Sequence, residues 1–344
     1  MVAITDVRAS NATIKTSQSP GRVSVFVGAT SGIGQGTLRQ LAKSSVRPKA
    51  YIVGRSKKAA TAQLEELRRL NPEGEFIFIE TDITLIKNVD TACEEIKSKE
   101  ERVDLLFMSP GYLGLHGRLE TSEGIDIPMT LRYYSRLRFV YNLLPQLKRS
   151  DSGRVVAILA AGKESAIDIN DLEVRKEFSM MKAAAVGTTQ TTLAFEELAK
   201  GNPDIAFVHK FPGLVATNSI GRMLSSATGL LRFPATVARI VLLPILKLFA
   251  SSVDEAGERG LFVATSARYP PARPNQPGVP LPQGLQVAQA SVTEDGRGNG
   301  VYRLSEVDDG IVTDDVLGPY RADGTATKNW ETTLAIWERA LGRN

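Results

Sequence analysis

The feature that most constrains the fold is RVSVFVGATSGIG at residues 22–34, an apolar run that leads into a glycine-rich turn. The valine-rich run predicts a buried strand, and a helix follows it. Gly28 permits the tight turn, Gly32 lets the backbone approach a pyrophosphate, and Gly34 lets the helix pack close to the sheet. Free N–H groups at the start of such a helix point at a phosphate. We therefore predict a phosphate-binding loop, with a purely structural glycine turn as the alternative. The other residues assigned to this loop are Thr30, Ser31 and Ile33.

Strands and helices alternate along the rest of the chain. Strands are predicted at residues 22–27, 50–54, 75–80, 103–108, 153–161, 204–210 and 301–305. Helices are predicted at about 33–45, 57–70, 88–100, 130–147, 178–200 and 329–341. This alternation indicates an α/β protein with a parallel sheet covered on both faces. Right-handed crossovers then give a Rossmann-like, doubly wound sheet of about seven strands.

We expect a single domain with a C-terminal extension. Residues 1–21 form a polar N-terminal arm, and residues 22–266 form the Rossmann-fold domain. Residues 267–300 are rich in proline and glycine and read as a surface loop. Residues 301–344 supply a strand and a helix that pack on the same domain.

Composition excludes several classes of function. The net charge is +4 and the lysines and arginines are scattered, which argues against a nucleic-acid partner. The single cysteine, Cys93, excludes an internal disulfide and fits a reducing compartment. The N-terminus lacks the apolar core of a signal peptide, so we expect a cytoplasmic location.

The longest apolar run is IVLLPILKLFA at residues 240–250. It is too short to span a bilayer, and it contains Pro244 and Lys247. A buried or subunit-facing helix is the plain interpretation of this run. The alternatives are peripheral contact with a membrane surface or a cover over an apolar pocket.

Arg55 ends the second predicted strand, about twenty residues after the phosphate loop, where an acidic residue would bind the ribose 2′-hydroxyl of NAD. A guanidinium there suits a 2′-phosphate, with Lys57 or Lys58 in support. We therefore predict NADP(H) in preference to NAD(H), unless Arg55 is simply a solvated surface residue. Asp82 follows the third strand, where it would bind the adenine amino group or cap a helix.

Together these stretches resemble the short-chain dehydrogenase/reductase family over roughly residues 22–266. GATSGIG is similar to the family's TGxxxGxG loop, and MSPG at 108–111 stands where the family has NNAG, keeping only Gly111. PGLVAT at 212–217 is similar to the family's PGxVxT stretch. The resemblance implies an oxidoreductase in which this stretch contacts the nicotinamide carboxamide. The residues concerned are Pro212, Gly213, Val215 and Thr217.

The sequence of residues 176–218 resembles fungal members of this family from secondary-metabolite pathways. With the apolar segment around 223–250, it implies a small hydrophobic substrate. Family members often pair through their fourth and fifth helices, so the resemblance also implies a homo-oligomer.

The catalytic residues of that family are only partly present. The family uses Tyr as acid and base, Lys to lower the pKa of that Tyr and hold the ribose, Ser to orient the substrate, and Asn in a proton relay. In FSMMK the Tyr position is Phe178, while Lys182 is retained. Ala160 stands at the Ser position, and Arg132 lies near the Asn position. General acid–base catalysis contributes about 10²–10⁴-fold, so its loss is severe for carbonyl reduction.

Other side chains near the same sheet edge are possible substitutes. Ser165, Glu164 and Asp168 follow the fifth strand, and His116 and Glu120 follow the fourth. Each also has a plain interpretation as a solvated loop residue. His209, in a predicted buried strand, is more simply a hydrogen-bonded core residue. We find no spacing of metal ligands and predict no metal site.

Three functions remain open. The first is an NADP(H)-dependent short-chain dehydrogenase/reductase-like oxidoreductase with an atypical proton donor. The second is a cyclase, isomerase or dehydratase on the same fold, without net redox chemistry. The third is a nucleotide-binding pseudoenzyme. We expect the first, chiefly because the family that the chain resembles consists of oxidoreductases. The residues themselves indicate binding of a nicotinamide nucleotide more firmly than reduction of a carbonyl.

Overall fold

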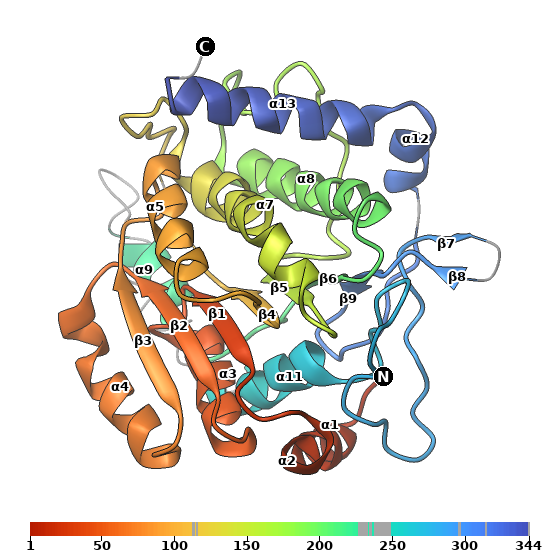
Figure 1. The fold of residues 1–344 in the computed structure, drawn as a ribbon. Helices are drawn as coiled ribbons and strands as arrows, with labels where there is room; N and C mark the ends of the chain where they lie inside the picture. Colours follow the sequence, from red (N-terminus) through yellow and green to blue (C-terminus); the bar gives the residue numbers. More distant parts are fainter. Residues whose placement is uncertain are drawn as a thin grey trace.

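A parallel sheet of seven strands forms the centre of the computed structural model (Figure 1), in the order β3-β2-β1-β4-β5-β6-β9. The structure describes residues 1–111, 114, 116–225, 233, 236, 249–294, 297–313 and 315–342. The seven strands are β1 (Val23–Val27), β2 (Lys49–Gly54), β3 (Glu75–Glu80), β4 (Leu105–Met108), β5 (Arg154–Ile158), β6 (Ala206–Lys210) and β9 (Val301–Leu304). Each pair of neighbouring strands runs parallel. The predicted Rossmann-like fold and its seven strands are therefore confirmed.

Helices cover both faces of the sheet. Helices α3, α4 and α11 pack on one face, and α5, α7 and α8 pack on the other (Figure 1). Val25 of β1 belongs to the core under α5, α7 and α8, whereas its neighbour Phe26 belongs to the core under α3 and α11. Both faces of the sheet are thus buried, which explains why its strands are continuous apolar runs. The helices are α1 (Ile4–Ala12), α2 (Ile14–Ser17), α3 (Gly32–Ser44), α4 (Lys57–Leu70), α5 (Ile86–Lys97), α6 (Ile127–Met129), the π-helix η1 (Thr130–Tyr134), α7 (Ser135–Lys148), α8 (Met180–Lys200), α9 (Ser219–Ser225), α11 (Val253–Thr265), α12 (Leu317–Ala322) and α13 (Thr325–Ala340).

Two segments at the ends of the chain dock on this sandwich. Residues 1–21, which the sequence predicts as a polar arm, form α1 and α2, and α1 packs on α11. Three apolar side chains, Val2, Val7 and Ile14, are buried there, and they hold an otherwise polar segment in place. At the other end, α13 lies across α7 and α8 (Figure 1).

The remaining predicted segments are covered in part. Residues 267–300 contain the short antiparallel strands β7 (Thr293–Glu294) and β8 (Arg297–Gly298). The predicted apolar segment 240–250, except for its last two residues, lies outside the described residues. Within the described part of the chain, no helix has the length and apolar character needed to cross a membrane.

Candidate active site

The glycine-rich turn after β1 is pressed against the end of β4. Gly28 has a φ of +80°, and a Cβ on it would lie 2.6 Å from the backbone nitrogen of Pro110. Gly32 has a φ of +64°, and its Cβ would lie 3.1 Å from Thr217 Cγ2. Only glycine combines these backbone angles with such close neighbours. The turn, the MSPG stretch and the PGLVAT stretch therefore meet at one edge of the sheet.

The start of α3 differs from the start of comparable helices. Serine is the N-cap residue of α3, α4, α8 and α11. In α4, α8 and α11 the serine hydroxyl accepts a hydrogen bond from a backbone N–H of the first turn. Ser31, at the start of α3, makes no such bond. The first N–H groups of α3 are therefore left without a cap, as a phosphate-binding turn requires.

Two buried contacts hold this turn in place. Gln63 of α4 donates a hydrogen bond from Nε2 to the Ala29 carbonyl, at 2.8 Å. Ser109, which follows β4, donates from Oγ to the Gly28 carbonyl, at 3.3 Å. Both bonds use carbonyl groups, and the Gly28 N–H donates to the Val53 carbonyl at 3.2 Å, so these contacts fix the turn without using the N–H groups at the start of α3.

The end of β2 carries the cations that the sequence assigns to a 2′-phosphate. The side chains of Arg55, Lys57 and Lys58 are exposed. Gly54, the residue before Arg55, lies against Thr30 of the glycine-rich turn, because a Cβ on it would be 2.9 Å from Thr30 Cγ2. Arg55 is thus adjacent to the turn.

Asp82, after β3, accepts a hydrogen bond from the Thr84 backbone N–H at 3.0 Å. This bond forms a local turn and does not cap α5, whose first N–H groups donate to the Glu123 carboxylate. The Asp82 side chain is exposed, so its second carboxylate oxygen stays accessible to a ligand.

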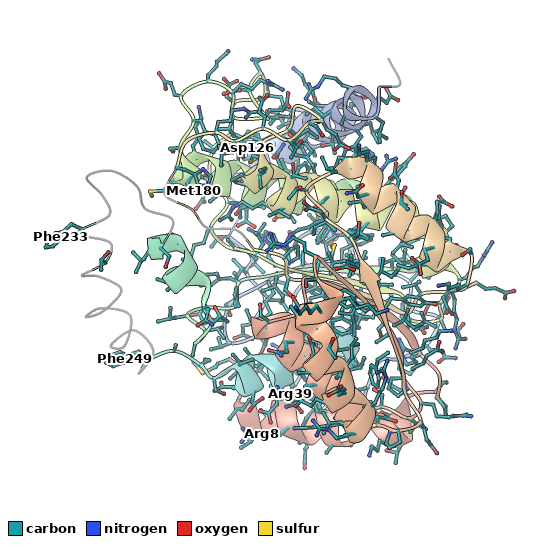
Figure 2. All side chains as sticks on the ribbon, turned by 90° about the vertical axis from the view of Figure 1, so that its left-hand side faces the viewer. Arg8, Arg39, Asp126, Met180, Phe233 and Phe249 are labelled. Carbon is teal, nitrogen blue, oxygen red and sulfur yellow. The ribbon has the colours of Figure 1, made fainter. Side chains whose placement is uncertain are left out.

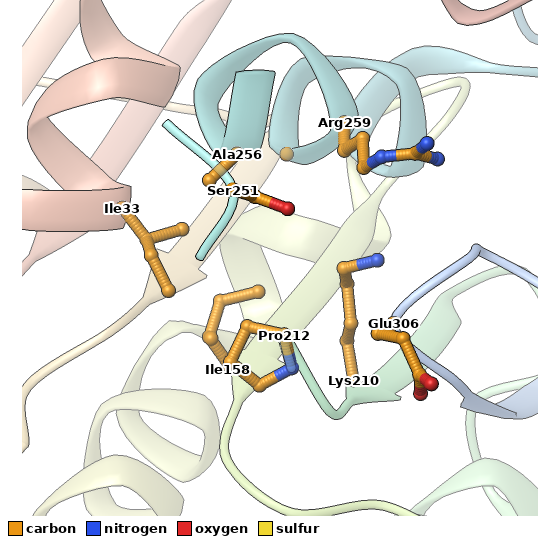
Figure 3. A pocket seen from close by; sticks show the side chains of 9 residues that line it. Ile33, Ile158, Lys210, Pro212, Ser251, Ala256, Arg259 and Glu306 are labelled. Carbon is orange, nitrogen blue, oxygen red and sulfur yellow. The ribbon is translucent and has the colours of Figure 1, made fainter. Parts of the chain in front are cut away.

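The PGLVAT stretch lies at the same edge of the sheet and borders the candidate site opposite the glycine-rich turn. Ala216 donates its backbone N–H to the Ser251 carbonyl at 2.9 Å, and Ser251 donates to the Leu214 carbonyl at 2.9 Å. Gly213, with a φ of +67°, packs against Glu306, and Gly111 has open space around it. A narrow hollow with a cavity volume of about 10 Å³ lies beside this stretch (Figure 3). Its lining includes Ile33, Ile158, Lys210, Pro212, Arg259 and Glu306.

Phe178, at the Tyr position, and the retained Lys182 lie in different surroundings. Phe178 is half-buried and packs against the core between the sheet and α7 and α8. The Lys182 ammonium donates to the Lys176 carbonyl at 2.9 Å and lies 3.7 Å from the Asp171 carboxylate. The side chain of Lys182 is 37% exposed. Lys182 therefore ties the start of α8 to the preceding loop, and its ammonium remains accessible.

Below the Ser position, a buried chain of hydrogen bonds holds the backbone. Ala160 donates its N–H to His209 Nε2 at 3.2 Å. His209 must therefore carry its proton on Nδ1, which donates to Thr192 Oγ1 at 2.9 Å. Thr192 in turn donates to Glu164 at 2.7 Å. Burial, together with the nearby charges of Arg136 and Arg303, lowers the pKa of His209 to about 3. His209 is thus the hydrogen-bonded core residue that the sequence suggests.

The other predicted substitutes are placed differently. Glu164 is buried, and its second oxygen lies 3.6 Å from the Arg303 guanidinium, so it belongs to this internal network. Ser165 is held through its backbone, which exchanges two hydrogen bonds with the Thr189 hydroxyl. The Ser165 side chain is half-buried and makes no hydrogen bond within the described part of the chain.

The remaining loop candidates are occupied by local contacts. His116 is half-buried and donates from Nδ1 to the Gly117 carbonyl at 2.7 Å. Glu120 pairs with Arg118 at 2.9 Å and with Arg175 at 3.2 Å. Asp168 accepts a hydrogen bond from the Asn170 N–H at 2.9 Å.

Arg136 is a site residue that the sequence does not single out. Its guanidinium is buried and donates to three carbonyls at the carboxyl ends of β4 and β5. The acceptors are Met108 at 3.1 Å, Ile158 at 3.0 Å, and Pro110. Burial lowers the pKa of Arg136 to about 9, so it stays a cation at neutral pH. The only signal in the sequence is an arginine on the buried face of the predicted helix 130–147.

Figure 2 shows the side of the molecule beyond this edge. Met180, at the start of α8, lies on the same side as Phe233 and Phe249. Phe233 and Phe249 are strongly exposed, as is Met181 next to Met180. The described residues on this side therefore present apolar surface next to the candidate site.

Comparisons with known proteins agree with this geometry. The family model described as short chain dehydrogenase matches residues 22–226. The oxidoreductase AN1596 of Emericella nidulans is 40% identical over the full length of both chains. The oxidoreductase andH of Emericella variicolor is 35% identical, over 99% of this chain and 98% of the relative. The solved structure of Pseudomonas aeruginosa RhlG with NADP is 20% identical, covers 79% of this chain and 98% of that one, and has a TM-score of 0.53, a likeness of fold. With the sheet order and the glycine-rich turn, these matches show that the chain belongs to the short-chain dehydrogenase/reductase family of oxidoreductases.

Proposed function

We propose that this protein is an NADP(H)-dependent oxidoreductase that acts on a small hydrophobic molecule of secondary metabolism in the cytoplasm. The observation that carries the proposal is the uncapped start of α3 beneath a turn that only glycine can form, with Arg55 beside it. Names of fungal relatives such as oxidoreductase AN1596 are consistent with redox chemistry.

The residues of the turn fit a dinucleotide. The N–H groups at the start of α3 would bind the pyrophosphate, and Arg55, with Lys57 and Lys58, would bind a 2′-phosphate. The exposed carboxylate oxygen of Asp82 would accept from the adenine amino group. Structural neighbours such as RhlG with NADP share the fold and bind this class of cofactor.

The PGLVAT side of the candidate site fits the nicotinamide end of the cofactor. A bound nicotinamide group would supply or accept the hydride. Pro212 and Ile33 offer apolar surface on one side of the hollow, and Thr217 and Val215 lie in the stretch next to the turn. Lys182, whose ammonium is partly exposed, would contact the ribose after partial release from the Lys176 carbonyl.

The proton must come from a residue other than Phe178. His209 and Glu164 are committed to the buried chain of hydrogen bonds, and Glu120 is committed to two arginines. The hydroxyl of Ser165 has no such commitment among the described residues, and it follows β5 at the ligand-binding edge. We therefore favour the Ser165 hydroxyl as the group that donates to the substrate oxygen.

A binding titration of the purified protein with NADPH, NADP⁺ and NADH tests the cofactor. We expect NADPH to bind at least ~10-fold more tightly than NADH, because a guanidinium–phosphate contact contributes roughly 1.5–3 kcal/mol. Arg55→Ala should weaken the binding of NADPH and leave the affinity for NADH unchanged. The matched control is Arg68→Ala, which removes an exposed arginine near the far end of α4, the helix that follows Arg55, and should change neither affinity. Equal affinity for both nucleotides, or no binding of either, would contradict the proposal.

A second candidate function is a rearrangement without net redox change, which the absence of hydroxyls at Phe178 and Ala160 favours. A panel of ketones and enones separates the two functions. One NADPH consumed for each product molecule supports the oxidoreductase, whereas conversion without nucleotide oxidation supports the rearrangement.

A further inference from the structure

Arg132 is a buried arginine without a partner. It lies in the π-helix η1 and is 8% exposed. Its Nε is buried and makes no hydrogen bond, and the described part of the chain gives its guanidinium neither a hydrogen bond nor an ion pair. Burial lowers the pKa of Arg132, and no carboxylate opposes that effect. A largely desolvated cation without a counter-charge is unfavourable, so an anion from outside the chain would stabilise it.

Other buried arginines of the same region are satisfied. Arg138, one and a half turns further along and also 8% exposed, pairs with both oxygens of Asp90 at 2.5 and 2.7 Å. Arg136 donates to the carbonyls at the ends of β4 and β5. Arg154 donates to the carbonyls of Val263 and Tyr269 at 2.7 and 2.9 Å. The unpaired state of Arg132 is therefore a property of its position.

That position is at the candidate active site. The side chain of Arg132 lies along α8, because a Cβ on Gly187 would be 3.5 Å from Arg132 Cβ and 3.9 Å from its Cδ. The charge of Arg132 also lowers the pKa of Arg136, so the two cations are neighbours. Arg136 marks the carboxyl ends of β4 and β5, which is the edge where ligands bind in such sheets. Two adjacent cations at this edge favour an anion there.

We propose that Arg132 binds a carboxylate of the substrate, so that the enzyme acts on a hydrophobic carboxylic acid. This inference rests on the proposed function. A guanidinium pairs with a planar carboxylate through two parallel hydrogen bonds. The phosphates of a nucleotide are a separate anion source, but they have their own donors at the start of α3. Exposed apolar side chains such as Met181 and Phe249 would contact the hydrophobic part of the substrate.

Thermal unfolding with a small anion tests this without knowledge of the substrate. The melting temperature Tm is measured in sodium acetate and in sodium chloride at equal ionic strength, with NADPH absent. We expect acetate to raise the Tm of the native protein, on the order of 2 °C, relative to chloride. Arg132→Met should abolish this difference and should have a Tm in chloride equal to or above that of the native protein, because it removes an uncompensated buried charge.

Arg138→Met is the matched control, since it removes an equally buried arginine that is paired. It should lower the Tm and keep the acetate effect. Arg132→Lys keeps the charge without the planar fork, and it should keep less than half of the acetate effect. The proposal is overturned if acetate stabilises the native protein and Arg132→Met equally, if it stabilises neither, or if Arg132→Met lowers the Tm as much as Arg138→Met.

A nucleotide titration of Arg132→Met keeps this result apart from the proposed function. Unchanged NADPH affinity with a lost acetate effect supports both proposals. A native protein that binds NADPH without any acetate effect retains the proposed function and loses the carboxylate site. An NADPH affinity that falls more than ~10-fold in Arg132→Met assigns Arg132 to the nucleotide and also overturns the carboxylate site.

Discussion

His209 illustrates how a single buried residue fixes the backbone of the candidate site. Its Nε2 lone pair accepts the Ala160 N–H, so Nε2 cannot be protonated without loss of this hydrogen bond. A protonated ring would also be a buried charge near Arg136 and Arg303. Ala160 lacks a hydroxyl, but its position at the end of β5 is still held by this imidazole. The histidine thus positions the backbone and takes no direct part in proton transfer.

The titration of His209 predicts a pH dependence of stability. Its pKa is about 3 in the folded protein and 6.5 in the unfolded chain. Between these pH values the unfolded chain binds a proton that the folded protein does not, so the free energy of unfolding falls as the pH falls. The slope from this one group is about 1.4 kcal/mol per pH unit.

We therefore expect His209→Gln to lack this slope. Urea unfolding at pH 6 and pH 5 should show that the native protein loses about 1.2 kcal/mol more than the variant over that interval. His116→Gln, which changes the other histidine of the chain, should behave like the native protein. Parallel pH curves for the native protein and His209→Gln would show that the imidazole accepts a proton when folded.

Secondary-structure elements from distant parts of the sequence are joined by the loop after β9. Asp308 is fully buried and pairs with Lys210 at the end of β6 and with Arg259 of α11, the latter at 2.8 Å. The Arg259 guanidinium also donates to the Val2 carbonyl at 3.3 Å, so the N-terminal segment is tied to the same point. This loop therefore fixes α11, which packs against the phosphate-binding helix α3.

Removing the charge of Asp308 should destabilise the protein strongly. Asp308→Asn leaves the buried Lys210 ammonium without a counter-charge and Arg259 with Glu255 as its remaining partner, and we expect a loss of about 3–5 kcal/mol in the free energy of unfolding. The neighbouring Asp309 is 41% exposed and pairs with the N-terminus and Arg268. Asp309→Asn should cost only about 0–1 kcal/mol. Urea unfolding of both variants measures these losses. Similar losses in free energy of unfolding would mean that the buried ion pairs of Asp308 do not hold β6 and α11 together.

The sequence predicts elements of this kind well and their polar contacts poorly. The strands were predictable because both faces of the sheet are buried, which makes each strand a continuous apolar run such as VSVFV in β1. Helix α1 was not predictable, since it carries few apolar residues and is stabilised by docking on α11. The partners of Arg136 are backbone carbonyls from two strands, and no residue pattern encodes such contacts. Glu164 reads as a loop carboxylate, but its burial against Arg303 depends on the register of β9 beside β6.

The molecule as a whole differs from the resemblance in how α7 and α8 are covered. The resemblance implies pairing of two copies through these helices. Here α13 of the same chain lies on them, with the Trp337 ring 5.7 Å from the Tyr141 ring and below the Arg138 guanidinium at 5.1 Å. The Thr333 hydroxyl is also 2.7 Å from the Tyr133 hydroxyl. The face that would bind a partner is therefore occupied within one chain.

We predict that the chain of residues 1–344 does not pair through α7 and α8 and is a monomer by light scattering at micromolar concentration. A chain that ends at residue 324 lacks α13 and would expose the apolar surface that Trp337 and Ile336 now bury. Contiguous apolar surface of this kind promotes association, so the shortened chain should form dimers or larger assemblies. A control chain that ends at residue 342 keeps α13 and should remain monomeric. A stable dimer of the chain of residues 1–344 whose size is unchanged by mutation of Tyr141, which is 44% exposed beside α13, would place the interface elsewhere. A dimer disrupted by that mutation would instead show that α13 and α7 pair across two chains, contrary to this prediction.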